Sequence, residues 1–166
     1  MENQNHLKSD TADHELIATR ILNAPRELVW KVWTDPEHVV QWWGPDGFTN
    51  TSHEMSVKPG GVWRLTMHGP DGRNYPNKIV FIEVIKPEYL SYKHSGDDEA
   101  EPVSHHVTVI FEKQGDKTKI TMKMVFESAE ELKRVDKEYG AIEGMKQCVN
   151  RLEKYVSKVR HETISN

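Results

Sequence analysis

The sequence predicts an α+β domain in which a curved antiparallel sheet of about six to seven strands wraps around a long C-terminal helix. The middle of the chain alternates apolar and polar residues between tight turns, which is typical of an antiparallel meander. The last third carries apolar residues three and four positions apart from 142 to 159, which is typical of one buried helical face. Because the sheet has one face to bury and only this helix is long enough to cover it, we expect a cavity between them.

The N-terminal part predicts one strand followed by two short helices. Residues 15–22 form the strand, with apolar side chains on both faces. Pro25 and Pro36 each suit the first turn of a helix, where the missing N–H costs nothing, and Asp35 can cap the second helix. The Gly-Pro pair at 44–45 ends that helix.

The remaining elements are predicted from alternation and turn residues. An acidic loop interrupts the strands at 96–102. Ser128 followed by Glu131 reads as a capping box that starts a short helix ending near residue 139. The strands are expected at 48–57, 62–68, 78–85, 89–94, 103–111 and 118–126.

Length and composition indicate one cytoplasmic domain. We expect a disordered lead-in at 1–13, a single domain at 14–160 and a tail at 161–166. A bilayer span needs about 20 apolar residues, and no such run is present, so no membrane role is expected. The single cysteine excludes an internal disulfide and fits a reducing compartment. The net charge of −4 gives no basic surface for nucleic acid.

Three of the five tryptophans fall within residues 33–43. Trp42 and Trp43 are expected to plug the junction between the second helix and the sheet, because burying such rings is strongly favourable. The competing interpretation is an exposed edge that binds a protein partner, since tryptophan is enriched at interface hot spots.

Nearly the whole chain, from about residue 15 to 159, resembles one known family. It is similar to the SRPBCC (START-like, birch-pollen-allergen-like) superfamily, in the AHSA-type branch named after the activator of the Hsp-ninety chaperone ATPase. The motifs that carry the resemblance are Ala24-Pro25, Val29-Trp30, Trp33-Thr34-Asp35-Pro36, Trp42-Trp43-Gly44-Pro45, Pro59-Gly60-Gly61-Val62-Trp63, Met67-His68-Gly69-Pro70-Asp71-Gly72, Tyr75-Pro76-Asn77, Lys86-Pro87-Glu88 with Leu90 and His94, and Tyr139-Gly140-Ala141-Ile142-Glu143-Gly144.

The resemblance implies the helix-grip fold, and it implies several functions. Relatives include lipid carriers, plant hormone receptors, aromatase/cyclases and chaperone co-factors, so the fold does not fix the function. One departure stands at Ser104-His105, where relatives more often carry aromatic or apolar residues before His106. If residue 105 lines the cavity, this pocket is more polar than in those relatives.

The leading hypothesis is a cavity that binds a small hydrophobic or amphipathic molecule. Methionines and aromatic residues fall on the sheet faces and helix stripe expected to face inward, and methionine suits adaptable pockets. His94 and Tyr139 are expected as polar anchors. The expected apolar lining is Trp63, Leu65, Tyr92, Val107, Met122, Met124, Phe126 and Met145.

The second hypothesis is a cyclase- or hydrolase-type enzyme that uses a cavity histidine and glutamate. His94 with Glu83, and more weakly His106 and Glu143, could transfer protons inside an apolar cavity. Ordinary structural hydrogen bonding explains the same residues, and no nucleophile–base–acid spacing is present. We therefore assign no catalytic residue.

No metal or cofactor is expected. His105 and His106 are adjacent in a predicted strand, so they point to opposite faces, and no zinc-type spacing occurs. Cys148 lies beside the apolar stripe with no neighbouring base and is expected to be an inert packed side chain. The third hypothesis is an interaction module, either a chaperone partner or a homodimer.

Overall fold

The computed structural model describes residues 12–97 and 104–165. A 3-10 helix at Ala12–His14 precedes the first strand. The strands are β1 (Glu15–Leu22), β2 (Thr49–Met55), β3 (Val62–His68), β4 (Asn74–Ile85), β5 (Tyr89–Gly96), β6 (Ser104–Gln114) and β7 (Lys117–Val125). The helices are α1 (Arg26–Thr34), α2 (Pro36–Val39), α3 (Ala129–Tyr139) and α4 (Ala141–Ser165).

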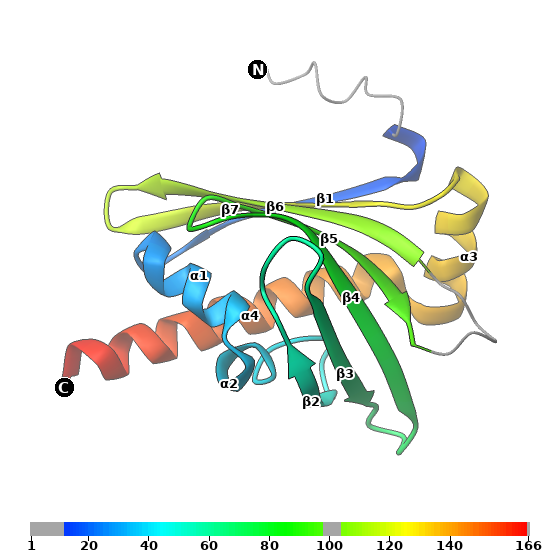
Figure 1. Cartoon of the computed structure of the whole chain (residues 1–166), viewed down its shortest axis with the longest axis horizontal. Helices are drawn as coiled ribbons and strands as arrows, with labels where there is room; N and C mark the ends of the chain where they lie inside the picture. The colour runs from blue at the N-terminus through cyan, green and yellow to red at the C-terminus, as the bar shows by residue number, and fades with distance from the viewer. Residues whose placement is uncertain (1–11, 98–103, 166) are drawn as a thin grey trace.

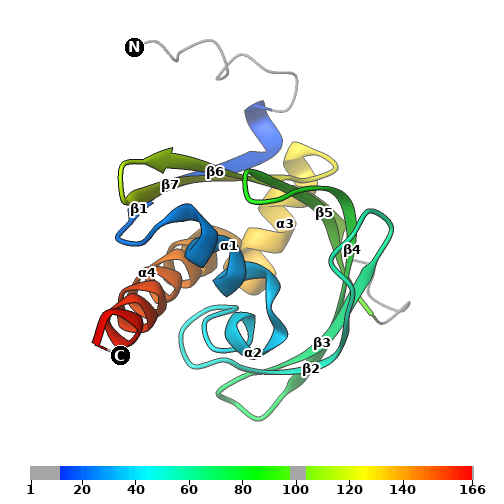
Figure 2. The same ribbon diagram turned by 60° about the vertical axis from the view of Figure 1, so that its left-hand side comes forward.

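All seven strands form one antiparallel sheet with the order β1-β7-β6-β5-β4-β3-β2. Strands β2 to β7 follow one another as a meander, and β1 joins the sheet beside β7 (Figure 1). The sheet curls so that its concave side faces α1, α2 and α4 (Figure 2). The predicted curved sheet around a long C-terminal helix, with two short helices after the first strand, is confirmed.

Two bulges help the sheet to curve. The pairing register shifts between Ser52 and Glu54 in β2 and between Phe81 and Glu83 in β4. An extra residue on one strand bends it and increases its local twist. The bulge in β4 also changes which side chains face inward beyond Phe81.

The helix ends follow the predicted capping residues. The side chain of Asp35 accepts a hydrogen bond from Glu37 N at 2.9 Å, with Pro36 in the first turn of α2. Ser128 Oγ accepts from Glu131 N at 3.0 Å, so the predicted start of α3 is confirmed.

Several boundaries differ from the expectation, and one of them is the end of α2, which lies at Val39 rather than just before the Gly-Pro pair at 44–45. β4 begins at Asn74 rather than at 78. Pro76 is tolerated in this strand because it pairs only with β3, one residue beyond the last pair between β4 and β5. α4 continues to Ser165, so the division at residue 160 does not coincide with a helix end. Residues 1–11 of the predicted lead-in and 98–103 of the predicted acidic loop lie outside the described residues. In the part of the chain that is described, no helix is long and apolar enough to cross a bilayer.

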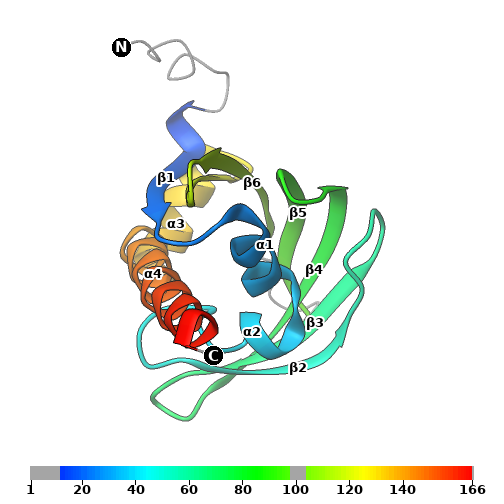
Figure 3. The ribbon, with the colours of Figure 1, turned by 90° about the vertical axis from the view of Figure 1, so that its left-hand side faces the viewer.

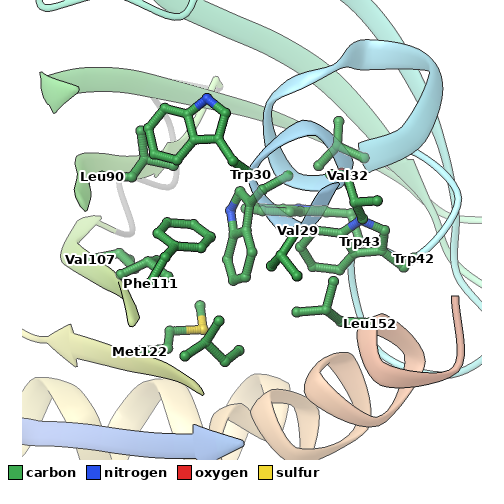
Figure 4. Packing of buried hydrophobic residues seen from close by; sticks show 14 of the residues in the cluster. Val29, Trp30, Val32, Trp42, Trp43, Leu90, Val107, Phe111, Met122 and Leu152 are labelled. Carbon is green, nitrogen blue, oxygen red and sulfur yellow. The ribbon is translucent and has the colours of Figure 1, made fainter. Parts of the chain in front are cut away.

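The core lies between the concave face of the sheet and α4, and tryptophans fill much of it. Viewed close to the axis of α4, helices α1 and α2 lie inside the curve of the sheet (Figure 3). Figure 4 shows Trp42 and Trp43 near Leu152 of α4, with Met122 of the sheet on another side. Trp42 and Trp43 are both buried, and Trp42 Nε1 donates to Val32 O at 3.1 Å. The predicted plug is confirmed.

Candidate functional site

The sheet and α4 bring most of the predicted lining residues together. His94 and Met124 are half-buried. Tyr139 is 46% exposed at the end of α3 and does not belong to this interior group. The buried members are Trp63 and Leu65 of β3, Tyr92 of β5, Val107 of β6, Met122 of β7, Phe126 just after β7, and Met145 of α4.

The indole of Trp43 occupies the space where the sequence predicts a ligand cavity. Its ring centroid lies 4.9 Å from that of Trp63, 6.4 Å from Tyr92 and 5.9 Å from His94. The cavity that remains has a volume of about 10 Å³, which suits no more than one water molecule. The expected cavity is therefore largely filled by the protein's own side chain. The residues that line the remaining space are Trp33, Trp43, Met55, Trp63, Ile79, Phe81 and Tyr92.

Two histidines continue the aromatic row from Trp43 towards the end of the sheet. His94 pairs with His105 across β5 and β6, and their ring centroids are 4.9 Å apart. His105 stacks on Phe126 at 5.0 Å, and His94 Nε2 donates to Asn77 Oδ1 at 2.7 Å. Burial lowers the pKa of both imidazoles, with a smaller effect from a neighbouring histidine, and the pKa of His105 falls to about 4. Both rings are therefore neutral near pH 7.

Several buried polar atoms in this interior lack a hydrogen-bond partner among the described residues. They are the hydroxyl of Tyr92, Nε1 of Trp33 and both ring nitrogens of His105. The first two face each other: against the larger raising effect of burial, the indole N–H of Trp33 lowers the pKa of the Tyr92 hydroxyl. Tyr92 is 1% exposed and Trp33 is 3% exposed, so bulk water does not reach them. An unsatisfied buried polar group costs about 1–3 kcal/mol. Burial raises the pKa of the Tyr92 hydroxyl, which therefore stays protonated.

Cys148 lies on α4 at the edge of this interior. Its side chain is half-buried and packs against the core. Burial raises the pKa of its thiol to about 11, which opposes a nucleophilic role near pH 7. The expectation of a thiol that only packs is consistent with this environment.

The structure does not bring the proposed acid–base residues together. Glu83 is exposed beyond the β4 bulge, and its main-chain N–H donates to Ser91 Oγ at 3.1 Å. His106 is exposed on β6, and Glu143 is exposed on α4. His94 takes Asn77 as its partner instead of a carboxylate. Within 12–97 and 104–165, no group of three histidine, cysteine or acidic side chains could hold a metal ion.

Arg151 of α4 fastens the loop that carries Trp43. Its Nη1 donates to the main-chain carbonyls of Trp43 at 3.1 Å, Gly44 at 2.8 Å and Pro45 at 2.7 Å. Its Nη2 donates to Phe48 O at 3.0 Å. Charge-assisted hydrogen bonds of this kind are stronger than neutral ones. The arginine thus fixes the backbone from one side while the indole points into the core.

A larger hollow lies on the surface, away from these residues. It has a volume of about 390 Å³ and is strongly open to solvent. Its arginine, Arg160, already bonds to Asn23 and Asp116. The guanidinium of Arg160 is therefore already paired and is not available to bind an anion in this hollow.

The sequence did not place Trp33 or Trp43 inside the predicted cavity, although Trp43 was expected at the junction of the second helix with the sheet, and it assigned no role to Asn77 or Arg151. The cluster of tryptophans at 33–43 was the available signal for the first two. The contacts of Asn77 with His94, and of Arg151 with the Trp43 loop, join residues far apart in the chain. They depend on strand register and on the path of a loop, which local sequence patterns do not contain.

Comparisons with known proteins agree with the fold. The structure matches a solution structure of a protein from Arthrobacter aurescens with a TM-score of 0.83 and 26% identity, covering 91% of this chain and 90% of the other. A crystal structure of a Mycobacterium smegmatis protein matches with a TM-score of 0.76 and 27% identity, covering 89% and 93%. A Nitrosomonas europaea protein shares the fold, with a TM-score of 0.78, 23% identity and coverage of 90% and 98%. No curated protein matches the sequence.

A family match covers most of the chain. Residues 23–157 match the family described as "Activator of Hsp90 ATPase homolog 1-like protein". The matched segment runs from the start of α1 to the second half of α4 and includes every residue of the interior described above. On this match and this fold, the chain belongs to the Activator of Hsp90 ATPase homolog 1-like family, the AHSA-type branch of the SRPBCC superfamily.

Proposed function

We propose that the protein binds a small amphipathic molecule between the concave face of the sheet and α4. The observation that carries the proposal is the set of buried polar atoms with unmet hydrogen-bonding capacity on Tyr92 and His105. They lie within walls that are otherwise aromatic and apolar. Binding sites for small molecules commonly combine such walls with a few convergent polar groups.

A ligand at this place would gain free energy in two ways. It would bury apolar surface against Trp63 and Met124, and it would supply hydrogen bonds to the Tyr92 hydroxyl and the His105 ring. A purely structural core gains nothing from leaving these atoms without partners. This difference favours a binding protein over a domain with only a packing role.

The test is native mass spectrometry of the protein isolated from the organism that makes it. We expect a reproducible added mass of a few hundred daltons that disappears when the protein is denatured. Gentle removal and re-addition of the identified compound should restore the adduct. The proposal would be contradicted if the protein shows only the mass of its polypeptide, even after incubation with extracts of its own cells.

A protein-interaction role is the second candidate. The family takes its name from an activator of a chaperone ATPase. On the outer face of the sheet, Ile85 pairs with Tyr89 of β5, and Tyr89 pairs with Ile110 of β6, so these residues form a continuous cross-strand row. Ile85 and Ile110 are both exposed. A contiguous exposed apolar surface of this kind offers a contact for a protein partner.

The second candidate is tested by adding the protein to the Hsp90-type chaperone of its own organism and measuring ATP hydrolysis. An increase that is lost in Ile85→Lys and Ile110→Lys, and kept in Ile21→Lys on β1, would support the interaction role. A concentration-dependent mass lost in the same two variants would indicate a homodimer instead. Unchanged hydrolysis and a constant monomer mass would exclude both.

A further inference from the structure

The indole of Trp43 is enclosed like a bound ligand. Aromatic rings surround it on several sides, with centroids at 5.7 Å for Trp42, 4.9 Å for Trp63, 6.4 Å for Tyr92 and 5.9 Å for His94. Only 6% of the residue is exposed. Yet Trp43 belongs to no helix or strand, because it stands in the connection between α2 and β2.

This connection is held by individual hydrogen bonds rather than by a helix or a strand ladder, including one from Asn50 Nδ2 to Trp43 O at 2.9 Å. Gly44 and Gly47 have φ values of +93° and +86°, which non-glycine residues rarely adopt. Every hydrogen bond described for the Arg151 guanidinium goes to main-chain carbonyls of this connection. Gln147 adds one more bond, accepting from Asp46 N at 3.0 Å.

The atoms without partners specify the chemistry of an occupant. The Nε1 of Trp33 is a donor only and faces the Tyr92 hydroxyl, so the hydrogen of that hydroxyl is the one that requires a further acceptor. Tyr92 can donate or accept, and a neutral His105 offers one donor and one acceptor. None of the rings that contact Trp43 carries a formal charge at neutral pH. The occupant is therefore neutral and carries at least one oxygen or nitrogen acceptor.

We infer that Trp43 is a displaceable internal plug, and that the ligand is a neutral planar aromatic molecule of about indole size bearing a hydrogen-bonding oxygen. The ligand takes the place of the indole between Trp63 and His94 and accepts a hydrogen bond from the Tyr92 hydroxyl. Arg151 controls the fraction of molecules in which the site is open, because it holds the Trp43 loop in the closed position. This inference rests on the proposed function and adds the ligand class and the residue that controls access.

The role of Arg151 has a quantitative consequence. When only a fraction of molecules is open, the apparent dissociation constant equals the intrinsic one divided by that fraction. Weakening the hold of Arg151 raises the open fraction and tightens binding without touching the ligand. Removing the indole makes the site permanently open, so Arg151 then no longer matters.

The experiment compares 2-naphthol with naphthalene by equilibrium dialysis. The two probes have the same rings, and only 2-naphthol has the oxygen. We expect the wild type to prefer 2-naphthol about tenfold. Arg151→Met should lower the apparent dissociation constant of each probe about tenfold. The matched control is Arg160→Met, which removes another arginine of α4 whose bonds go to Asn23 and Asp116, and it should change neither affinity.

Two further variants separate the plug from the polar anchor. Trp43→Ala should bind both probes at least as tightly as Arg151→Met, and adding Arg151→Met to Trp43→Ala should give no further gain. Tyr92→Phe should reduce the preference for 2-naphthol about fivefold while leaving naphthalene unchanged. Circular dichroism and thermal melts establish that each variant is folded. If Arg151→Met does not fold, Arg151→Lys, which keeps the charge with fewer donors, should give a smaller change in the same direction.

The outcomes distinguish the plug from the proposed function. If the isolated protein carries a native ligand but Arg151 variants leave probe affinity unchanged, the plug is wrong and ligand binding stands. If Arg151→Met tightens the probes equally in the Trp43→Ala background, Trp43 is not the element displaced. If no variant binds either probe and the protein carries no native ligand, both proposals fail.

Discussion

His94 and His105 face each other across β5 and β6 with their ring centroids 4.9 Å apart. Burial opposes a proton on either ring, and His105 lacks a hydrogen-bond partner for both nitrogens among the described residues. Two facing imidazoles without a nearby carboxylate are an unfavourable place for positive charge. The pair therefore makes the domain sensitive to mild acid.

The first prediction concerns the pH dependence of stability. In the unfolded chain His105 protonates near its ordinary pKa of 6.5, whereas in the folded protein it protonates near 4. Between these values the unfolded state binds more protons, so the free energy of unfolding falls as the pH drops from 6.5 towards 4. For this half-buried ring we expect the free energy of unfolding to fall by an amount on the order of 2 kcal/mol. Urea denaturation at several pH values measures it.

His105→Phe provides the control for this prediction. Phenylalanine keeps a ring stacked on Phe126 and removes the titrating group. The variant should lose less stability than the wild type between pH 6.5 and 4, with the remaining slope including His94. An identical slope in the two proteins would show that His105 is not responsible.

The second prediction concerns the wall formed by β7. Met124 is half-buried, pairs with Val107 of β6 and packs against the core. Met124→Glu places a carboxylate against the ligand site, and we expect it to abolish the native adduct at a cost of about 1–3 kcal/mol in stability. Ile110→Glu puts the same charge on the exposed outer face of β6 and should keep the adduct. A folded Met124→Glu protein with full binding would remove this residue from the site.

The third prediction concerns the glycine that follows Trp43. A Cβ at Gly44 would lie 2.8 Å from Cε of Met67, whereas a Cβ at Gly72 would meet nothing within 4 Å. Both glycines have similar positive φ values, +93° and +87°. Gly72→Ala should therefore cost about 1–2 kcal/mol from the backbone alone. Gly44→Ala should cost about 1 kcal/mol more, because Met67 must shift.

Chemical denaturation of the two alanine variants checks the third prediction. Equal losses would mean that the flexible end of Met67 moves aside freely. A loss that is larger for Gly72→Ala would contradict the steric account of the Trp43 loop.

The fourth prediction concerns the start of α3. Ser128 Oγ accepts the hydrogen bond from Glu131 N at 3.0 Å. Ser128→Ala leaves that N–H without its side-chain acceptor and should lower stability by about 1 kcal/mol. Ser128→Asp keeps an acceptor and adds a favourable charge at the helix N-terminus, so it should stay near the wild type. Thermal melts of the two variants should differ in this order, and a reversed order would disprove the cap.

The sequence was sufficient for elements whose signals are local. The stripe from Ile142 to Val159 predicted α4, and the Pro25 and Pro36 signals placed the two short helices. Alternation predicted the inward faces of β3, β5 and β7, because side-chain direction in a regular strand has period two. These features depend on residues that are close together in the chain.

Other features depend on irregularities that alternation does not reveal. By simple alternation Glu83 shares a face with Phe81 and could meet His94. The bulge between Phe81 and Glu83 breaks the period, and Glu83 is exposed. The filling of the cavity by Trp43 likewise follows from a loop path fixed by Arg151, more than one hundred positions away. No short-range pattern encodes either result.

The position of β1 has a consequence for the order of events during folding. Strands β2 to β7 each pair with a neighbour in sequence, so they can form hairpins by closing short loops. β1 must wait, because its partner β7 lies near the far end of the domain, and Glu15 pairs with Val125. During synthesis β1 emerges before its partner β7, so the β1–β7 pairing can form only after β7 has been made. Joining the chain termini and reopening the chain between β1 and α1 would place β1 after α4, and comparing its refolding rate with that of the natural order would reveal whether this late pairing limits folding.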